Sequence, residues 1–223
     1  MKEISPEDYE VLISGGEILE KDKFGSKVYL LPENNICKLF RCKRTISSAK
    51  IYPYAQRFLD NSAKLAELGI PTVTVKEIYR APHIERDIVV YPMLPGETLR
   101  KVLTETEDRI PLIEKFIDFI IDLHDKGVYF RSLHFGNVIV KPDGEFGLID
   151  VSDMKISSGS LMMIKRVRNF KAIMRYTEDR EFLAEFGFKR FFDHYIKTAK
   201  LSSGMFYAIL KMQKKHPAVK ILF

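Results

Sequence analysis

The chain is poor in cysteine and has no long apolar run. Its only cysteines, Cys37 and Cys42, form no CxxC motif and no Cys/His cluster, which argues against a structural zinc site. We expect both to be free thiols in a reducing compartment. No stretch approaches the roughly 18 uninterrupted apolar residues that a membrane-spanning helix requires. The run MKEISPEDYEVL has no apolar block of the signal-peptide kind, so we predict a cytoplasmic protein.

Low-complexity tracts are also absent, and the composition is that of an ordered protein. The 223 residues are 46% hydrophobic and 30% charged, which favours a globular fold over disorder. This length suffices for one domain or two small lobes, and we expect a single folding unit.

Acidic residues are missing from two basic segments, although the net charge of the whole chain is only +6. The first, residues 38–57, contains Lys38, Arg41, Lys43, Arg44, Lys50 and Arg57; the second, residues 161–175, contains Lys165, Arg166, Arg168, Lys171 and Arg175. Such runs suit an anionic partner, which would be nucleotide phosphates, a phosphorylated sugar, lipid headgroups or nucleic acid. A simple solvated basic face remains the alternative.

The first ninety residues predict a small sheet interrupted by one helix. Residues 17–31 have the pattern of two strands joined by a tight turn near Gly25, and NICKLFR that of a third strand. Apolar spacing over 47–68 predicts an amphipathic helix that LGIP ends. The runs TVTVKEIYR and DIVVYPML are β-rich.

After LPGE the pattern becomes mainly helical. The run RIPLIEKFIDFIIDLHDKG predicts a buried helix that ends at Gly127. VYFRSLHFGNVIV, the turn KPDG and EFGLID then predict a hairpin around an irregular loop. Beyond Ser158 we expect helices, interrupted at Gly187 and Gly204.

Three polar residues carry the functional argument. Lys38 has apolar neighbours on both faces of its strand, so its ammonium would be costly to bury unless an anion meets it. The alternative is an edge-strand lysine that reaches water. Asn137 and Asp150 stand at the two ends of the predicted hairpin and offer hard oxygen ligands for a magnesium ion that also holds phosphates. Each could instead cap its own turn.

The run RSLHFGNVIV…GLID resembles the catalytic loop and magnesium-binding aspartate of the protein-kinase-like superfamily, particularly its bacterial branch with HGDLHxxN and LID. In that pattern the catalytic Asp precedes the Asn by five residues, and the Asn precedes the metal Asp by thirteen. Ser132, Asn137 and Asp150 keep both intervals. Lys38 matches the phosphate-pairing lysine of the third strand, and VVYPMLPGETL resembles the hinge between two lobes.

Within the superfamily, YPYAQRF, LGIP, YFRSLHFGNV and LIDVSDM resemble the lipopolysaccharide core (Kdo/heptose) kinase and toluene tolerance protein group, over most of residues 15–195. The resemblance implies an α+β, bilobal protein-kinase-like fold. Residues 1–91 would form a nucleotide-binding N-lobe, a small β-sheet with one helix. Residues 92–223 would form a mainly helical C-lobe with the catalytic loop and the metal-binding Asp.

The implied activity is ATP-dependent phosphorylation of a sugar hydroxyl of the lipopolysaccharide core, with ATP and Mg as cofactors. The acceptor would be an anionic glycolipid or another phosphorylated sugar, with peripheral contact to the inner face of the cytoplasmic membrane. The implied catalytic residues are Ser132, His134, Asn137 and Asp150; the nucleotide-binding residues are Lys38, Gly25, Tyr91 and Met93; the metal ligands are Asn137 and Asp150.

The chain departs from this pattern in its catalytic loop. Ser132 replaces the catalytic Asp and Phe130 the preceding His. A neutral serine hydroxyl cannot accept the acceptor's proton as a base, a loss of about 10²- to 10⁴-fold. His134 and Asp153 are the candidate substitutes, each with a structural role as its alternative.

Two further departures concern the nucleotide. The run KDKFGSKV has one glycine, so it would cradle phosphates weakly. The helix over 47–68 has only Asp60 and Glu67 as acids, neither at the expected place for an ion pair with Lys38.

Three hypotheses follow from these residues. The first is an active sugar kinase, based on Lys38, Asn137 and Asp150. The second is a pseudokinase that binds nucleotide or a lipopolysaccharide precursor and acts as a regulator or scaffold, based on Ser132 and Phe130. The third, a nucleic-acid-binding domain, rests on charge alone and has the least support.

Overall fold

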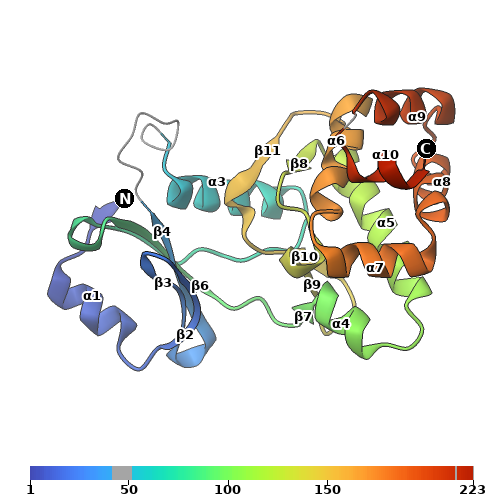
Figure 1. Cartoon of the computed structure of the whole chain (residues 1–223). Coiled ribbons are helices and arrows are strands. Elements are labelled where there is room, and N and C mark those ends of the chain that lie inside the picture. The colour runs from blue at the N-terminus through green and yellow to red at the C-terminus, as the bar shows by residue number, and fades with distance from the viewer. Residues whose placement is uncertain (42–51, 214, 223) are drawn as a thin grey trace. The chain divides into compact units, whose positions relative to one another are not determined.

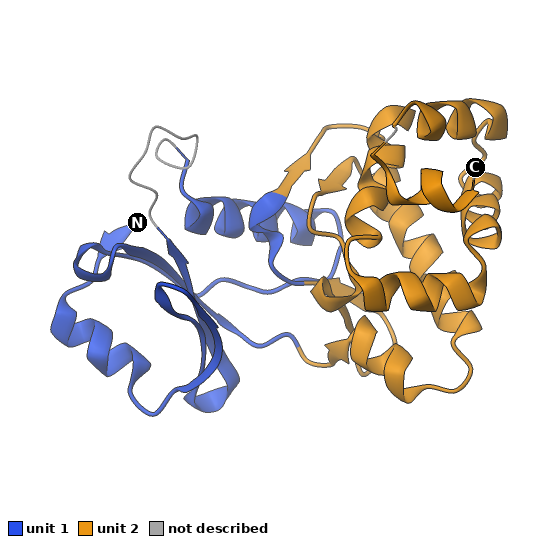
Figure 2. Cartoon of the chain, in the orientation of Figure 1, with its two compact units in different colours: residues 1–94, 149–153 blue, residues 95–148, 154–223 orange. Residues whose placement is uncertain are grey.

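The computed structural model describes residues 1–41, 52–213 and 215–222 (Figure 1). Cys42, the basic residues Lys43, Arg44 and Lys50, and the predicted helix start near Ser47 therefore lie outside the described residues. The chain divides into two compact units (Figure 2). Unit 1 comprises residues 1–94 and 149–153, and unit 2 comprises residues 95–148 and 154–223.

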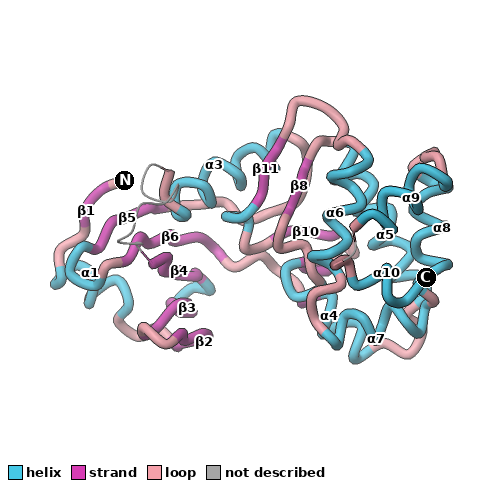
Figure 3. The backbone as a smooth tube through the Cα atoms, turned by 45° about the horizontal axis from the view of Figure 1, so that its top comes forward, coloured by secondary structure: helices cyan, strands magenta, loops and turns pink. Residues whose placement is uncertain are grey.

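Unit 1 is built on a six-stranded sheet of order β1-β5-β6-β4-β3-β2 (Figure 3). Its strands are β1 (Lys2–Glu3), β2 (Glu17–Asp22), β3 (Gly25–Leu31), β4 (Asn35–Arg41), β5 (Glu77–Ala81) and β6 (Arg86–Pro92). All neighbouring strands are antiparallel except β1 and β5. The predicted β2–β3 hairpin and the strand NICKLFR are confirmed. Because β4 pairs with β3 and β6, its Lys38 does not lie on an edge strand.

The two faces of this sheet bury different sets of side chains. On one face Cys37, Leu39, Ile88 and Val90 form a core with Tyr9 of α1 (Pro6–Ile13). Alternation along the strands places Lys38 and Tyr91 on the other face. The helix α3 (Tyr54–Glu67) supplies Phe58 there, and its ring stacks on Tyr91 with centroids 5.1 Å apart.

The helix α3 ends as LGIP predicts, with Gly69 in a left-handed conformation at φ +69°. The sequence patterns predicted only this helix in the N-terminal part, and α1 is an addition. It begins with Ser5 as N-cap, whose Oγ accepts the Asp8 N–H, and with Pro6 in its first turn.

Unit 2 contains two small groups of strands beside its helices. The strands β7 (Glu97–Thr98), β9 (Val138–Val140) and β10 (Phe146–Leu148) form one sheet, in which the predicted β9–β10 hairpin is confirmed. The strand β8 (Val128–Phe130) pairs instead with β11 (Met154–Ile156). This second pairing was not predicted.

The helices of unit 2 are α4 (Leu99–Glu105), α5 (Ile110–Asp125), α6 (Met163–Ile173), α7 (Thr177–Phe186), α8 (Phe188–Thr198), α9 (Ser203–Met212) and α10 (Pro217–Leu222). Their core is aromatic: Phe170 of α6 meets Phe192 and Tyr195 of α8 edge-on, at 5.1 and 4.8 Å. Gly187 separates α7 from α8 as predicted. The predicted interruption at Gly204 is wrong, because the Ser202 cap starts α9 at Ser203 and Gly204 lies in its first turn.

Candidate functional site

Lys38 lies at the centre of the unit 1 sheet and is paired with a carboxylate. Its Nζ is 2.7 Å from Asp150 Oδ1, and its side chain is only 8% exposed. The Phe40 and Phe58 rings lie 5.6 and 6.0 Å from the ammonium. A buried ammonium among aromatic rings requires a counter-charge. The expected anion is therefore present, and the alternative of an edge-strand lysine is wrong.

Asp150 belongs to unit 1, in the short segment 149–153 that follows β10. Its φ of +56° is left-handed, a conformation that Asp tolerates better than most residues. Its side chain is 36% exposed, so part of the carboxylate reaches solvent. The Asn61 side chain of α3 donates to the Val151 carbonyl at 2.8 Å and holds the segment in place.

The acids of α3 do not pair with Lys38. Asp60 accepts hydrogen bonds from Tyr52 Oη and Gln56 Nε2, and Glu67 is exposed at the end of the helix. Lys38 therefore has no acidic partner among the described residues of α3, and its counter-charge is Asp150, which lies outside that helix. The contribution of α3 to this segment is the neutral amide of Asn61.

The remaining nucleotide-binding candidates, Gly25, Tyr91 and Met93, are all in unit 1. Gly25 is exposed at the start of β3, directly after the turn from β2, with φ +114°. Tyr91 is buried, and burial together with the negative charge of Asp150 raises its pKa, so its phenol stays protonated. The Met93 side chain is exposed, while its N–H donates to the Asn34 carbonyl at 2.8 Å. Their contact with a nucleotide stays a prediction.

Ser132 and Asn137 are brought together in unit 2. Asn137 is buried at the end of a single 3₁₀ turn (Phe135–Asn137), and its Nδ2 donates to the Ser132 carbonyl at 2.9 Å. Its own N–H donates to the His134 carbonyl at 2.9 Å. With Nδ2 used in this way, Asn137 Oδ1 is the side-chain atom that can serve as a ligand. Residues 132–137 are called the catalytic loop below, after the segment that they resemble in sequence; that they catalyse a reaction stays a prediction.

A buried carboxylate accepts a hydrogen bond from the backbone of the catalytic loop. Asp179 of α7 is fully buried and accepts the Phe135 N–H at 3.1 Å. Arg100 of α4 balances its charge, with Nε 2.7 Å from Asp179 Oδ1. This ion pair therefore ties a backbone donor of the loop to two helices.

A chain of hydrogen bonds supports the strand before the loop. Asn169 Nδ2 donates to the Phe130 carbonyl at 2.6 Å, and Asn169 Oδ1 lies 3.1 Å from His124 Nε2. His124 Nδ1 lies 2.7 Å from Tyr195 Oη. Burial is the main cause that lowers the pKa of His124 to about 3, and the positive charge of Arg166 is a smaller one. The imidazole is neutral, with Nε2–H as donor to the amide and Nδ1 as acceptor.

His134, the candidate substitute base, packs as a ring. It meets Tyr176 edge-on with centroids 4.7 Å apart. A Cβ at Gly136 would come within 3.3 Å of its Nδ1, so the loop fits closely around the imidazole. Its role as a base stays a prediction.

Sequence reasoning missed the residues that support these groups. Asn61 and Asn169 each lie on the buried face of an amphipathic helix, and a polar residue there is a signal that could have flagged them. Asp179 gave no such signal, because TEDREF reads as an acidic first turn facing water.

Neither a cage of protein side chains for a metal nor a membrane span is found in the described parts of the chain. No group of three or more His, Cys, Asp or Glu residues among them could hold a metal ion. A carboxylate and an amide oxygen can still contribute to magnesium binding, because Mg²⁺ usually keeps several waters and phosphate oxygens as ligands. No described helix has the length and apolarity needed to cross a bilayer.

No protein-family model matches the chain, and no curated protein matches its sequence. Solved structures do resemble it. A crystal structure of monomeric WbdD aligns with a TM-score of 0.50 and 18% identity, over 84% of this chain and 44% of that one. The fold is protein-kinase-like. A structure described as the bifunctional kinase-methyltransferase WbdD gives a TM-score of 0.47 and 17% identity, over 84% and 47%. The chain spans less than half the length of these WbdD chains.

This likeness confirms the predicted fold class, a small β-sheet N-terminal part and a helical C-terminal part. At this low identity it concerns the fold alone. The lipopolysaccharide acceptor, the nucleotide and the metal remain proposals.

Proposed function

We propose that the chain is an ATP- and Mg-dependent phosphotransferase that acts on a sugar hydroxyl of the lipopolysaccharide core. The observation that carries the proposal is the 2.7 Å contact between Lys38 and Asp150, two residues 112 positions apart that match the phosphate-binding lysine and the metal-binding aspartate of the superfamily. A buried ammonium beside a partly exposed carboxylate offers a cation for phosphates and an anion for their metal ion.

Each residue has a defined part in this proposal. Lys38 would bind the nucleotide phosphates, and Asp150 with Asn137 Oδ1 would hold the magnesium ion. The metal supplies charge neutralisation for the transferred phosphoryl group. Gly25, Tyr91 and Met93 would complete the nucleotide site. The catalytic loop would position the acceptor hydroxyl, with His134 as the candidate base. The acceptor would be an anionic glycolipid reached by peripheral contact with the inner membrane.

The test is phosphate transfer to a lipopolysaccharide core oligosaccharide, measured by mass spectrometry as the gain of one phosphoryl group. Asp150→Asn should abolish the transfer and the stabilisation by ATP and Mg in a thermal-shift titration. Asp122→Asn is the matched control, because Asp122 of α5 forms an ion pair with Lys126, directly after this helix, at the surface of unit 2. Transfer that persists at the wild-type rate in Asp150→Asn would refute the proposal.

A second candidate is a pseudokinase that binds nucleotide or a lipopolysaccharide precursor and regulates or scaffolds another enzyme. Ser132 favours it, because a hydroxyl cannot act as the general base. The two functions predict opposite results. An active kinase shows transfer in the wild type that falls in Ser132→Ala. A pseudokinase shows no transfer in the wild type, retains its thermal shift with ATP and gains transfer in Ser132→Asp.

A further inference from the structure

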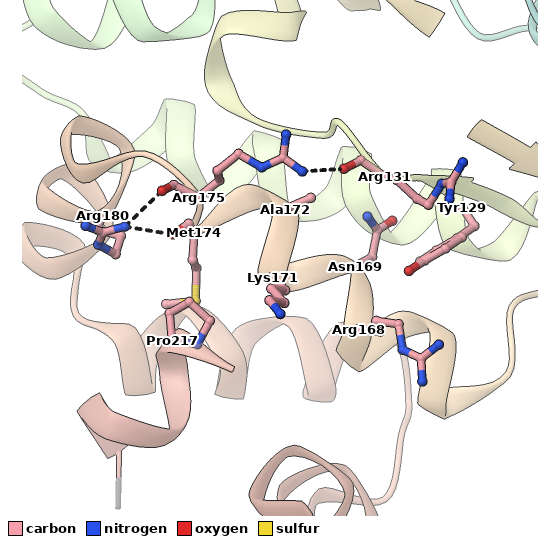
Figure 4. Close-up of a pocket in the computed structure, with 10 residues that line it drawn as sticks. All are labelled: Tyr129, Arg131, Arg168, Asn169, Lys171, Ala172, Met174, Arg175, Arg180 and Pro217. Carbon is pink, nitrogen blue, oxygen red and sulfur yellow. Dashed lines mark hydrogen bonds between the residues drawn. The ribbon is translucent and has the colours of Figure 1, made fainter. Parts of the chain in front are cut away.

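Unit 2 contains a basic pocket of about 450 Å³ beside the catalytic loop (Figure 4). It lies between the end of β8, the helix α6, the start of α7 and the N-terminus of α10. Its cationic lining residues are Arg131, Arg168, Lys171, Arg175 and Arg180. Arg131 directly precedes Ser132, so one wall of the pocket continues into the catalytic loop.

The described wall of this pocket has several cationic side chains and no acidic one. Arg180 donates to the carbonyls of Met174 and Arg175 at 3.0 and 3.1 Å, and also to Thr177 Oγ1 at 2.8 Å. These acceptors are neutral. They orient the guanidinium but leave its charge available to a ligand.

The wall is also held in position. Arg175 Nη2 donates to the Arg131 carbonyl at 3.3 Å, which links the segment after α6 to the loop (Figure 4). Asn169, another lining residue, is fixed by its bonds to Phe130 and His124. Arg175 and Arg180, which are held in this way, lose less side-chain entropy when they bind an anion than free side chains would.

The positive charge of the pocket also affects the pKa of a neighbouring histidine. His216, directly before α10, is buried, and its ring Nε2 lies 3.2 Å from the Val167 carbonyl. Burial lowers the pKa of His216 to about 4, a value that also includes an opposing effect of the Val167 hydrogen bond and a smaller lowering by the positive charge of Lys171. The histidine therefore stays neutral near pH 7, and the positive potential here comes from the lysine and the arginines.

We propose that this pocket binds the phosphate ester group of a sugar phosphate or of a phosphorylated glycolipid headgroup. Guanidinium groups match phosphate oxygens in a bidentate geometry, and a pocket of this volume lies in the range used for small ligands. The rest of the ligand would extend past Arg131 toward Ser132. Its role as the acceptor rests on the phosphotransferase function proposed above, whereas phosphate binding does not. As an acceptor, the ligand would already carry a phosphate from an earlier phosphorylation reaction.

The test is calorimetric titration of the full chain without nucleotide, at low salt, with glucose 6-phosphate as the probe and glucose as its uncharged counterpart. Vesicles of phosphatidylcholine with and without phosphatidylglycerol form the second arm. Lys171→Glu reverses a charge in the pocket, and Lys197→Glu makes the same change on an exposed lysine of α8 outside it. Arg168→Gln is a milder second variant, and circular dichroism checks the fold of each.

We expect a phosphate-bearing probe to bind and glucose not to bind. The affinity for the phosphate-bearing probe should be at least about tenfold weaker in Lys171→Glu, weaker in Arg168→Gln and unchanged in Lys197→Glu. Binding of glucose 6-phosphate would identify a sugar phosphate, and binding only of phosphatidylglycerol vesicles would identify a headgroup. No binding of either probe, or equal losses in Lys171→Glu and Lys197→Glu, would overturn the proposal. Because no nucleotide is present, this result is independent of the Asp150→Asn transfer test.

Discussion

The ion pair between Lys38 and Asp150 should be energetically asymmetric. The Lys38 side chain is 8% exposed and the Asp150 side chain is 36% exposed. Removing one partner of a fully buried pair costs about 3–5 kcal/mol, because the other charge is left buried alone. Asp150→Asn leaves the buried ammonium of Lys38 without a counter-charge, whereas Lys38→Met leaves the Asp150 carboxylate, which water can reach.

We work out the magnitudes from these exposures. Because Asp150 is partly exposed, some water can reach the Lys38 ammonium once the carboxylate charge is removed. We therefore expect Asp150→Asn to lose less than a fully buried pair would, about 2 kcal/mol of unfolding free energy. Asn also tolerates the left-handed φ of +56°, which keeps backbone strain out of the comparison. Lys38→Met should lose less than about 1 kcal/mol, because the thioether packs between Phe40 and Phe58.

The assay is urea unfolding of both single variants and the double variant, followed by circular dichroism because the chain has no Trp. The double variant should be about as stable as Lys38→Met, which gives a coupling energy of about 1.5–2 kcal/mol. If Lys38→Met proves more destabilising than Asp150→Asn, or the coupling is near zero, the burial argument is wrong.

Three further predictions concern unit 2. Asp179→Asn removes the charge that pairs with Arg100 and weakens the hold on the Phe135 N–H, so we expect a loss of about 2–3 kcal/mol in urea unfolding and slower phosphate transfer. Gly127→Ala should lower the free energy of unfolding by about 2 kcal/mol, because φ is +77° and the new Cβ would lie 2.4 Å from the Ser157 carbonyl oxygen. A loss of 1 kcal/mol lowers the melting temperature of such a domain by roughly 2–4 °C. A decrease of less than about 1 °C in melting temperature would therefore contradict this prediction. The folded-state pKa values of His124 and His216, about 3 and 4, lie below the usual 6.5, so the unfolded chain binds more protons and stability falls as the pH drops below about 6.5. Each histidine contributes about 1.4 kcal/mol per pH unit, so urea midpoints at pH 7 and pH 5 should differ clearly, and His216→Asn should reduce the difference.

The sequence predicted the groups whose cost or spacing is visible locally. Lys38 among apolar neighbours required an anion, and the structure provides Asp150. The turn KPDG fixed the β9–β10 hairpin, because short hairpins depend on local turn chemistry. The end of α3 at Gly69 followed from the same kind of local signal.

The sequence did not predict the parts that depend on distant contacts. The β8–β11 pairing joins three-residue strands, too short for alternation to be recognised. The helix α1 has a start signal in Ser5 and Pro6, but eight residues are too few to show a helical period. Asp179 lies 44 positions from Phe135, and only the folded chain shows that this carboxylate faces a backbone N–H and not water.

The support around the catalytic loop bears on whether Ser132 ends catalysis. The backbone on both sides of Ser132 is held by buried polar groups, Asn169 at Phe130 and Asp179 at Phe135, and Asn137 binds the Ser132 carbonyl itself. Buried polar groups are expensive unless fully paired, so this arrangement gives the loop one defined conformation.

Phosphoryl transfer depends mostly on positioning and on electrostatic stabilisation by the metal and cations. A loop that retains its position but not its base would therefore lose about 10²- to 10⁴-fold in rate. That loss is smaller than the total acceleration that enzymes achieve, so slow transfer by the wild type is the outcome we expect. If Ser132→Asp gave no increase in transfer, the absence of a base would not be what limits the rate.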